Sequence, residues 1–210
     1  MLARIPRTAT VALAALTAFA WVITAVLGRD EAMALALGFI PARLSGLESP
    51  FAAIPAFLTP LSSTLVHAGL IHLLFNLLLL LWCGSAVERV LGRANLLLIY
   101  IVGAYAAAIA QWAVDPLSFT PMIGASGAVS AVIGAFALSF GRARSLSRSP
   151  RFNRLLNAMW LLAAWIVLQL AIGWLAGGQG QLLATPAHIG GFLAGLLMQR
   201  PLLLWRYRSA

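Results

Sequence analysis

Residues 124–135 read GASGAVSAVIGA, with a serine between two glycines at the start of a run of small apolar residues. The run belongs to a segment apolar enough to enter a bilayer. A hydroxyl there has either a packing role or a chemical role. Small residues let membrane helices approach closely, and a buried serine can hydrogen-bond to its own backbone. On this stretch alone, packing is the simpler interpretation of Ser126.

The composition of the 210-residue chain is that of an integral membrane protein. Hydrophobic residues make up 62% of the chain and charged residues 9%, against about 25% charged residues in a soluble domain. The mean hydropathy is +0.95. The length fits one domain, residues 1–210. The single cysteine, Cys83, lies in an apolar run and is expected to pack as a small hydrophobic residue.

Six segments are apolar enough for a spanning helix, which needs about 20 residues. We therefore expect an all-α, polytopic membrane protein with spans at 8–27, 70–90, 94–114, 126–140, 155–175 and 187–207. The fourth span is short, so it is expected in the middle of the bundle, where its neighbours shield it from lipid. The first span is expected to be retained, because its apolar stretch is longer than that of a signal peptide.

The basic residues are all arginines, and their placement predicts the orientation of the chain. With six spans, one side of the membrane holds Arg4, Arg7, Arg89, Arg93, Arg142, Arg144, Arg148, Arg151, Arg154, Arg200, Arg206 and Arg208. The other side holds only Arg29 and Arg43. By the positive-inside rule, both termini are cytoplasmic. This placement explains the net charge of +9 without a nucleic-acid partner.

Three connecting segments have informative compositions. The first external loop, 28–66, alternates apolar residues with prolines, which predicts short helices lying in the membrane interface. The loop 176–185 is rich in glycine and is expected to be mobile. The loop 141–154 is rich in serine and arginine and is expected to be a solvated connector.

Polar residues within spans are rare and count as functional candidates. Most of those in this chain lie near the outer ends of spans two, four and six: His67, His72, Asn76, Ser126 and His188. These three spans run inward from the outer face, so the five residues lie within about two helical turns of it. Gln111 and Gln169 are the main polar residues of spans three and five.

Small residues predict that spans four and six can meet. Residues 126, 130 and 134 share one face of span four, and His188, Gly191 and Gly195 share one face of span six. If the two faces meet, the Ser126 hydroxyl comes within reach of the His188 imidazole. Serine becomes a nucleophile when an adjacent base, usually histidine, takes its proton. Ser126 and His188 are therefore candidate catalytic residues.

Candidate donors to a developing oxyanion lie close by. They are the unpaired N–H groups at the start of span four and the side chains of His72 and Asn76. A packing interpretation remains open for His67, as an interfacial residue, and for Asn76, as a helix–helix hydrogen bond. No metal or cofactor is expected, because the histidine spacing is not HExxH and carboxylates with ligand spacing are missing.

Together these motifs resemble the rhomboid family of intramembrane serine proteases. Residues 124–127 match its GxSG motif, residues 67–76 its HxxxxHxxxN motif and residues 187–195 its AHxxGxxxG motif. Residues 88–92 read ERVLG and are similar to the ExRxLG turn of the family, with the arginine one position early. The family's Trp-Arg pair in the first loop is absent, and Leu58-Thr59 stands at about that place.

The resemblance implies a six-helix rhomboid bundle that hydrolyses peptide bonds in or near transmembrane helices of substrate proteins. By this resemblance Ser126 and His188 form a dyad that requires no acid, and the Ser126 N–H, His72 and Asn76 hold the oxyanion. His67, Gly124, Gly127, Gly191 and Gly195 support the motifs. The loop 176–185, with span five, would gate lateral entry of the substrate.

The same resemblance implies a bacterial cytoplasmic (inner) membrane protein whose active site lies near the outer face. Two alternatives from other classes stay open. One is a non-catalytic, rhomboid-like protein that binds client helices, and the other is a small transporter. A transporter favours polar residues near the midplane and internal repeats. Neither is evident in this sequence.

Overall fold

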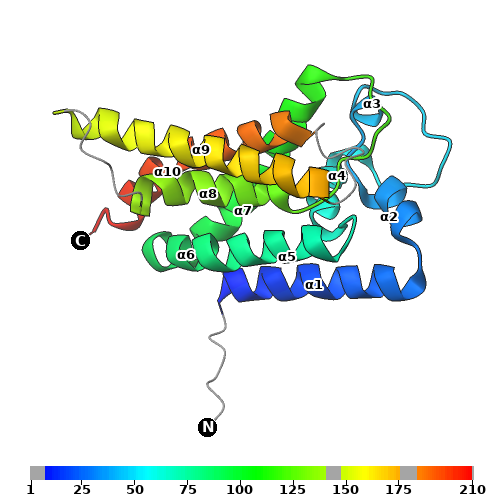
Figure 1. Ribbon diagram of the computed structural model, residues 1–210, viewed down its shortest axis with the longest axis horizontal. Coiled ribbons are helices and arrows are strands. Elements are labelled where there is room, and N and C mark those ends of the chain that lie inside the picture. Colours follow the sequence, from blue (N-terminus) through cyan, green and yellow to red (C-terminus); the bar gives the residue numbers. More distant parts are fainter. Residues whose placement is uncertain (1–7, 141–147, 176–183, 210) are drawn as a thin grey trace, which may run out of the picture.

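The computed structural model describes residues 8–140, 148–175 and 184–209, and these residues are mainly helical. Within those ranges five helices are long and apolar enough to cross a membrane. They are α1 (Ala9–Leu27), the continuous helix Leu70–Leu91, α7 (Arg93–Val114), α9 (Pro150–Leu175) and α10 (Thr185–Arg206). The all-α prediction is therefore confirmed, and the long helices lie side by side (Figure 1).

The helix Leu70–Leu91 is made of three parts. They are α5 (Leu70–Leu79), a π-helical turn η3 (Leu80–Gly84) and α6 (Ser85–Leu91). At the end of η3, a side chain on Gly84 would press against Thr10 of α1. The missing side chain thus lets α1 approach this helix closely.

The shorter helix α8 (Ser126–Phe140) lies in the centre of the bundle (Figure 1). Eleven of its 15 residues are buried. At 1.5 Å per residue it is about 22 Å long, which is less than the roughly 30 Å of a hydrocarbon core. Its ends are therefore set back from the ends of the longer helices around it.

Glycines bring α8 and α10 into backbone contact. A Cβ on Gly195 of α10 would clash with the carbonyl oxygen of Ala131, and one on Gly134 of α8 would clash with that of Phe192. Such close approach is the main source of attraction between helices in lipid, where dispersion replaces the hydrophobic effect. The predicted meeting of the two small-residue faces is therefore present in the fold.

The start of α1 is held by a carboxylate from α6. Glu88 accepts hydrogen bonds from the backbone N–H groups of Ala9 (3.0 Å) and Thr10 (2.9 Å) and from the Thr10 hydroxyl (2.6 Å). Arg93 pairs with the same carboxylate at 3.5 Å. A carboxylate beside a helix N-terminus satisfies unpaired N–H groups and complements the helix dipole.

One end of the bundle, called the terminal end below, is defined by Ala9, Gly92 and Tyr207. Besides the Glu88 contacts with α1, the Tyr207 hydroxyl donates to the carbonyl oxygen of Val90 (3.1 Å). The first residues of α1, the turn between α6 and α7 and the last residues of α10 therefore lie together.

The opposite end, called the loop end below, carries the short helices of residues 28–66 and the segment 115–125 (Figure 1). The helices are α2 (Asp30–Leu37), α3 (Pro41–Leu44), η1 (Ala56–Leu58), α4 (Thr59–Ser62) and η2 (Ser63–Leu65). Phe39 exchanges two backbone hydrogen bonds with Met122, at 3.0 and 2.7 Å. This bridge ties the first loop to the segment that enters α8. Short helices are present in this loop, and their position in the membrane interface stays a prediction.

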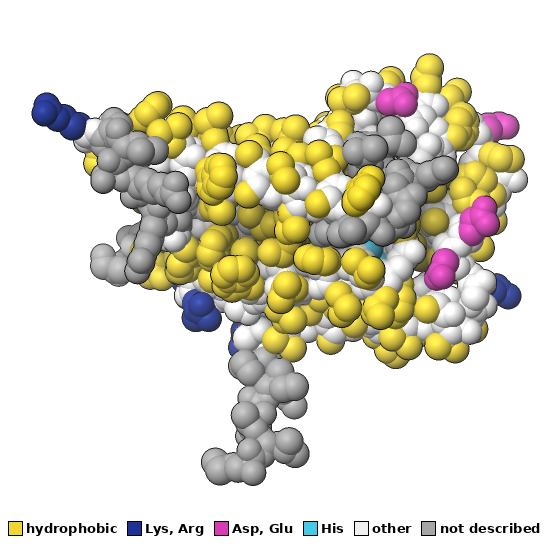
Figure 2. All heavy atoms as spheres, in the orientation of Figure 1, with side chains coloured by type: hydrophobic (Ala, Val, Ile, Leu, Met, Phe, Trp, Pro, Cys, Tyr) yellow, Lys and Arg dark blue, Asp and Glu magenta, His cyan; other side chains and the backbone are white. Residues whose placement is uncertain are grey.

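Charged and apolar side chains lie on different parts of the surface (Figure 2). Apolar side chains cover the flank of the bundle, and acidic side chains gather at the loop end. Phe19, Val26, Trp82 and Trp174 are among the large apolar side chains left exposed on the long helices. An exposed apolar surface of this kind is expected to face lipid rather than water.

The predicted span boundaries agree with the helices except at the fifth. Helix α9 begins at Pro150 rather than at residue 155. The last five residues of the predicted connector 141–154 are therefore helical, and most of them are exposed. Proline suits the first helical position, where its missing N–H costs nothing. Long arginine side chains tolerate the end of a span because their heads reach water. Residues 141–147, and 176–183 of the loop expected to be mobile, lie outside the described residues.

Candidate active site

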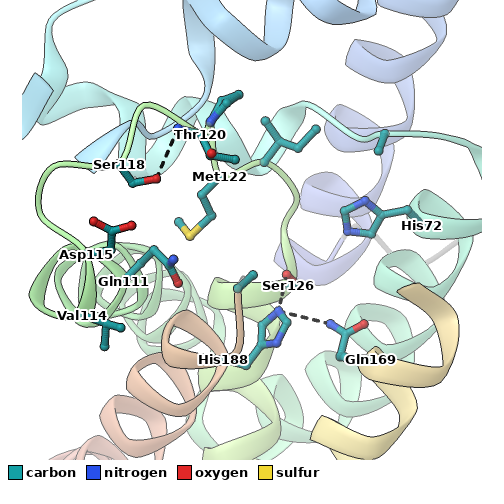
Figure 3. A pocket seen from close by; sticks show the side chains of 14 residues that line it. His72, Gln111, Val114, Asp115, Ser118, Thr120, Met122, Ser126, Gln169 and His188 are labelled. Atoms are coloured by element: carbon teal, nitrogen blue, oxygen red, sulfur yellow. Dashed lines mark hydrogen bonds between the residues drawn. The ribbon is translucent and has the colours of Figure 1, made fainter. Parts of the chain in front are cut away.

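A cavity of about 470 Å³ opens at the loop end of the bundle. Helices α5, α7, α8, α9 and α10 each contribute a polar side chain to its lining: His72, Gln111, Ser126, Gln169 and His188 (Figure 3). Its size is in the range of small-molecule and peptide side-chain sites. Polar groups from five helices thus converge on one space.

The central contact of the cavity joins Ser126 and His188. The Ser126 Oγ lies 2.9 Å from the His188 Nε2, and both residues are buried (6% and 5% exposed). Ser126 is the first residue of α8, and His188 lies in the first turn of α10. The contact follows from the glycines, because a side chain on Gly191 would collide with the Gly127 carbonyl oxygen.

The geometry suits transfer of the serine proton to histidine. At 2.9 Å the hydroxyl can donate to Nε2 when the imidazole carries its proton on Nδ1. The side-chain nitrogen of Gln169 lies 3.4 Å from the same Nε2. Among the described residues no carboxylate hydrogen-bonds to His188.

The Trp165 ring of α9 lies beside the His188 imidazole. The Trp165 and His188 rings lie 6.0 Å apart at 59°. The indole Nε1 donates to the Ser130 Oγ (2.7 Å), and that hydroxyl donates to the carbonyl oxygen of Ser126 (2.7 Å). Trp165 therefore contacts the histidine directly and the serine through Ser130.

His72 and Gly124 face one another across the entry to α8. Gly124 has φ +108°, a left-handed conformation that favours glycine, and a Cβ on it would strike the His72 ring. The Gly124 N–H donates to the carbonyl oxygen of Ser63 (2.9 Å). Glycine at this position thus both allows the turn and leaves room for His72 to face the cavity (Figure 3).

His67 lies behind His72 and does not line the cavity. Its Nε2 accepts the Ala125 N–H at 3.4 Å, and its ring lies 5.0 Å from the His72 ring. Burial first, and then the neighbouring His72, lower the pKa of His67 to about 3. His67 is therefore neutral and holds the segment that precedes Ser126.

Asn76 also lies outside the cavity lining. Its Nδ2 donates to the His72 carbonyl oxygen (2.9 Å) one turn earlier in α5, and its Oδ1 is buried without a hydrogen-bond partner. In this arrangement the Asn76 amide is directed along its own helix. A buried, half-satisfied amide is a costly group, which favours a task that its present contacts do not fulfil.

Sequence reasoning singled out Gln111 and Gln169 only as exceptions, and it missed Trp165. Both glutamines line the cavity, and Gln169 reaches His188. The sequence did carry a signal for them, because they are the main polar residues of spans three and five. Trp165 had no such signal, because one tryptophan in an apolar span does not reveal which helix it faces.

The fold and the cavity define a polytopic membrane protein with a buried serine–histidine pair. Residues 56–205 match the Rhomboid domain. The chain is 34% identical over 169 residues to rhomboid protease GlpG of Pectobacterium atrosepticum, covering 76% of this chain and 56% of that protein. It is 32% identical over 138 residues to rhomboid protease GluP of Bacillus subtilis, covering 66% of this chain and 24% of that protein.

This chain belongs to the rhomboid family. It spans about half the length of the Pectobacterium relative and about a quarter of the Bacillus relative. The spanning helices and the bacterial relatives identify it as a multi-pass protein of a bacterial inner membrane.

Proposed function

We propose that this protein is an intramembrane serine endopeptidase that uses a Ser126–His188 dyad. The observation that carries the proposal is the 2.9 Å contact between the Ser126 Oγ and the His188 Nε2 in a cavity at the end of a membrane bundle. The relatives' names, rhomboid protease, support the same reaction class. Its substrates are membrane proteins cut in or near a transmembrane helix.

In the first step His188 accepts the Ser126 proton as the Oγ attacks the peptide carbonyl. The C–N bond then breaks, the acyl group stays on Ser126, and His188 returns the proton to the leaving amine. A water molecule then attacks the ester carbonyl while His188 accepts its proton. The bond between the acyl carbon and the Ser126 Oγ breaks, the acid product leaves, and His188 returns the proton to the Oγ. The pair needs no metal or cofactor for this chemistry.

The oxyanion is held at the start of α8. The Ser126 N–H belongs to the first turn, where backbone donors have no partner within the helix. His72 faces the same cavity and supplies a side-chain donor. Asn76 supplies a second when its amide turns from the His72 carbonyl oxygen, while His67, Gly124 and Gly127 keep the segment in place.

The helix α8 completes a six-span bundle in this proposal. Residues 1–210 then form one rhomboid domain in which α8 is the recessed central span. The distribution of the arginines supports an orientation with both termini in the cytoplasm and the loop end at the outer face.

Cleavage by the purified protein tests the proposal. In detergent or proteoliposomes it is expected to cut a transmembrane model substrate, and Ser126→Ala or His188→Ala is expected to abolish cleavage. Ser139→Ala is the matched control, because Ser139 lies near the other end of α8 and contacts Ala135 and Gln199 instead. Thermal unfolding verifies that each variant is folded. Cleavage by folded Ser126→Ala at the parent rate would refute the proposal, and client binding without cleavage would favour the non-catalytic alternative.

A further inference from the structure

The cavity extends beyond the serine–histidine pair to the last turn of α7. Gln111 and Val114 of this turn line the cavity. So does Asp115, the C-cap residue that follows α7, whose N–H donates to the Gln111 carbonyl oxygen (3.2 Å). Figure 3 shows the Gln111 and Asp115 side chains on the far side of the cavity from His72. The proposed mechanism uses neither residue.

Among the described residues, the side-chain oxygen atoms of Gln111 and Asp115 accept no hydrogen bond. The Gln111 Oε1 is buried. Asp115 is exposed, and its backbone makes hydrogen bonds with Gln111 and Ser118. Within the described part of the chain, Asp115 has no ion-pair partner. The Asp115 carboxylate is therefore open to a donor that enters the cavity, and a turn of the Gln111 amide would bring its buried Oε1 to the same donor.

The rest of the lining is complementary to a long cationic side chain. Of the described residues that line the cavity, Asp115 is the one carboxylate and none is an arginine. Val114 and Met122 supply apolar surface between Asp115 and the inner part of the cavity. Lysine and arginine side chains bury their apolar stems along such surfaces and keep the charged head near water.

We propose that Gln111 and Asp115 form a subsite for a lysine or arginine side chain of the substrate, close to the scissile bond. The inference rests on the proposed protease function and names the substrate class that this site selects. The head group pairs with the Asp115 carboxylate and donates to the Gln111 Oε1. In the proposed orientation the subsite lies near the outer face, where flanking segments of membrane proteins are poor in basic residues. A cation requirement there is therefore selective.

The test uses one transmembrane substrate with a single lysine, glutamine or glutamate placed in turn at each position within about four residues of its cleavage site. At one of these positions we expect the parent protein to cleave the lysine substrate with a kcat/KM about tenfold above that of the glutamate substrate. The Asp115 carboxylate attracts the lysine side chain and repels the glutamate side chain, so the two effects add. The ratio is expected to fall as salt rises.

Variants of the subsite make the test specific. Asp115→Asn is expected to reduce the lysine-to-glutamate ratio, Asp115→Lys to invert it, and Gln111→Leu to lower kcat/KM for the lysine substrate. Glu48→Gln is the matched control, because Glu48 is another exposed acid of the loop end that does not line the cavity. Labelling of Ser126 by a small fluorophosphonate reports whether the serine–histidine pair is intact in each variant.

Two outcomes separate the subsite from the function. If Ser126-dependent cleavage occurs without a charge preference at any position, or Asp115→Lys keeps the parent ranking, the subsite is refuted and the protease stands. If no substrate is cleaved in a Ser126-dependent manner, the proposed function fails first. An equal loss of preference in Glu48→Gln would also refute the subsite, because the general field of the loop end would then explain the selectivity.

Discussion

The indole nitrogen of Trp165 donates to the Ser130 hydroxyl at 2.7 Å, and the Trp165 ring lies against that of His188. One side chain of α9 thereby contacts both partners of the candidate dyad, the histidine directly and the serine through one hydroxyl. Among the described side chains of α9, only Asn153, Ala158 and Trp165 are buried. Trp165 is therefore a principal link between this exposed helix and the catalytic pair.

Replacing Trp165 by phenylalanine is expected to keep a ring against His188 and to remove the hydrogen bond to Ser130. We expect kcat to fall about threefold to tenfold with little change in KM, because a modest loss of preorganisation costs about 1 kcal/mol. If Trp165 had a purely structural role, the variant would unfold at a lower temperature without a selective fall in kcat. Ser130→Ala combined with Trp165→Phe is expected to be non-additive, since both remove the same bond. Additive effects would contradict the link.

Gly191→Ala is expected to separate the dyad. Its Cβ would collide with the backbone of α8 at Gly127, and overpacking of this kind costs about 1–3 kcal/mol. Because the backbone rather than a flexible side chain must yield, His188 moves from Ser126 and cleavage is lost. Gly69→Ala is the matched control, since no atom lies within 4 Å of a Cβ at that extended position. Parent activity in Gly191→Ala would contradict the packing account.

Glu88→Gln is expected to loosen α1 from the bundle. The carboxylate accepts three hydrogen bonds from Ala9 and Thr10, and charge-assisted bonds of this kind contribute about 1.5–3 kcal/mol each at most. We expect a lower unfolding temperature and faster proteolysis near residue 9. Glu31→Gln, in the exposed first turn of α2, serves as the comparison. Equal stability of the two variants would argue against this role of Glu88.

The pH dependence of stability is expected to include a contribution from His67. Its pKa falls from 6.5 to about 3 on folding, so the unfolded chain binds the extra proton between these values. The contribution of neutral His67 to the free energy of unfolding is therefore fully present above pH 6.5. It is lost as the pH falls toward 3, by at most about 1.4 kcal/mol per pH unit.

Unfolding of the parent and of His67→Gln between pH 7.5 and 5 measures this contribution. The variant is expected to lose less stability over the interval. Because the other histidines remain in both proteins, the difference in slope belongs to His67. Identical slopes would show that His67 does not change its protonation on unfolding.

The arrangement of spans could be predicted because membrane burial leaves a strong signal in apolar length. The same was true of the approach of Ser126 to His188, since residues 126–134 and 188–195 carry small residues at helical spacing. Helical periodicity does not say which way a side chain faces across a bundle, so Trp165 was missed. The start of α9 was misplaced because Pro150 and the arginines after it resemble a loop in composition.

The position of Asn76 shows the limit of motif spacing. Residues four apart in α5 share a face, which placed Asn76 with His72 at the candidate site. The Asn76 amide instead donates to the His72 carbonyl oxygen. Asn76→Ala is expected to slow cleavage by about 10²–10³ if the amide turns to the oxyanion during the reaction. A rate within twofold of the parent would assign Asn76 to packing alone.

Fluorophosphonate labelling with mass-spectrometric mapping tests the central claim most directly, because it depends on an activated serine and on no assumed substrate. We expect one modification, on Ser126, that is lost in Ser126→Ala and slowed at least a hundredfold in His188→Ala, by analogy with the loss of a catalytic base of about 10²–10⁴. Labelling of another serine, or of Ser126 at the parent rate in folded His188→Ala, would contradict the dyad.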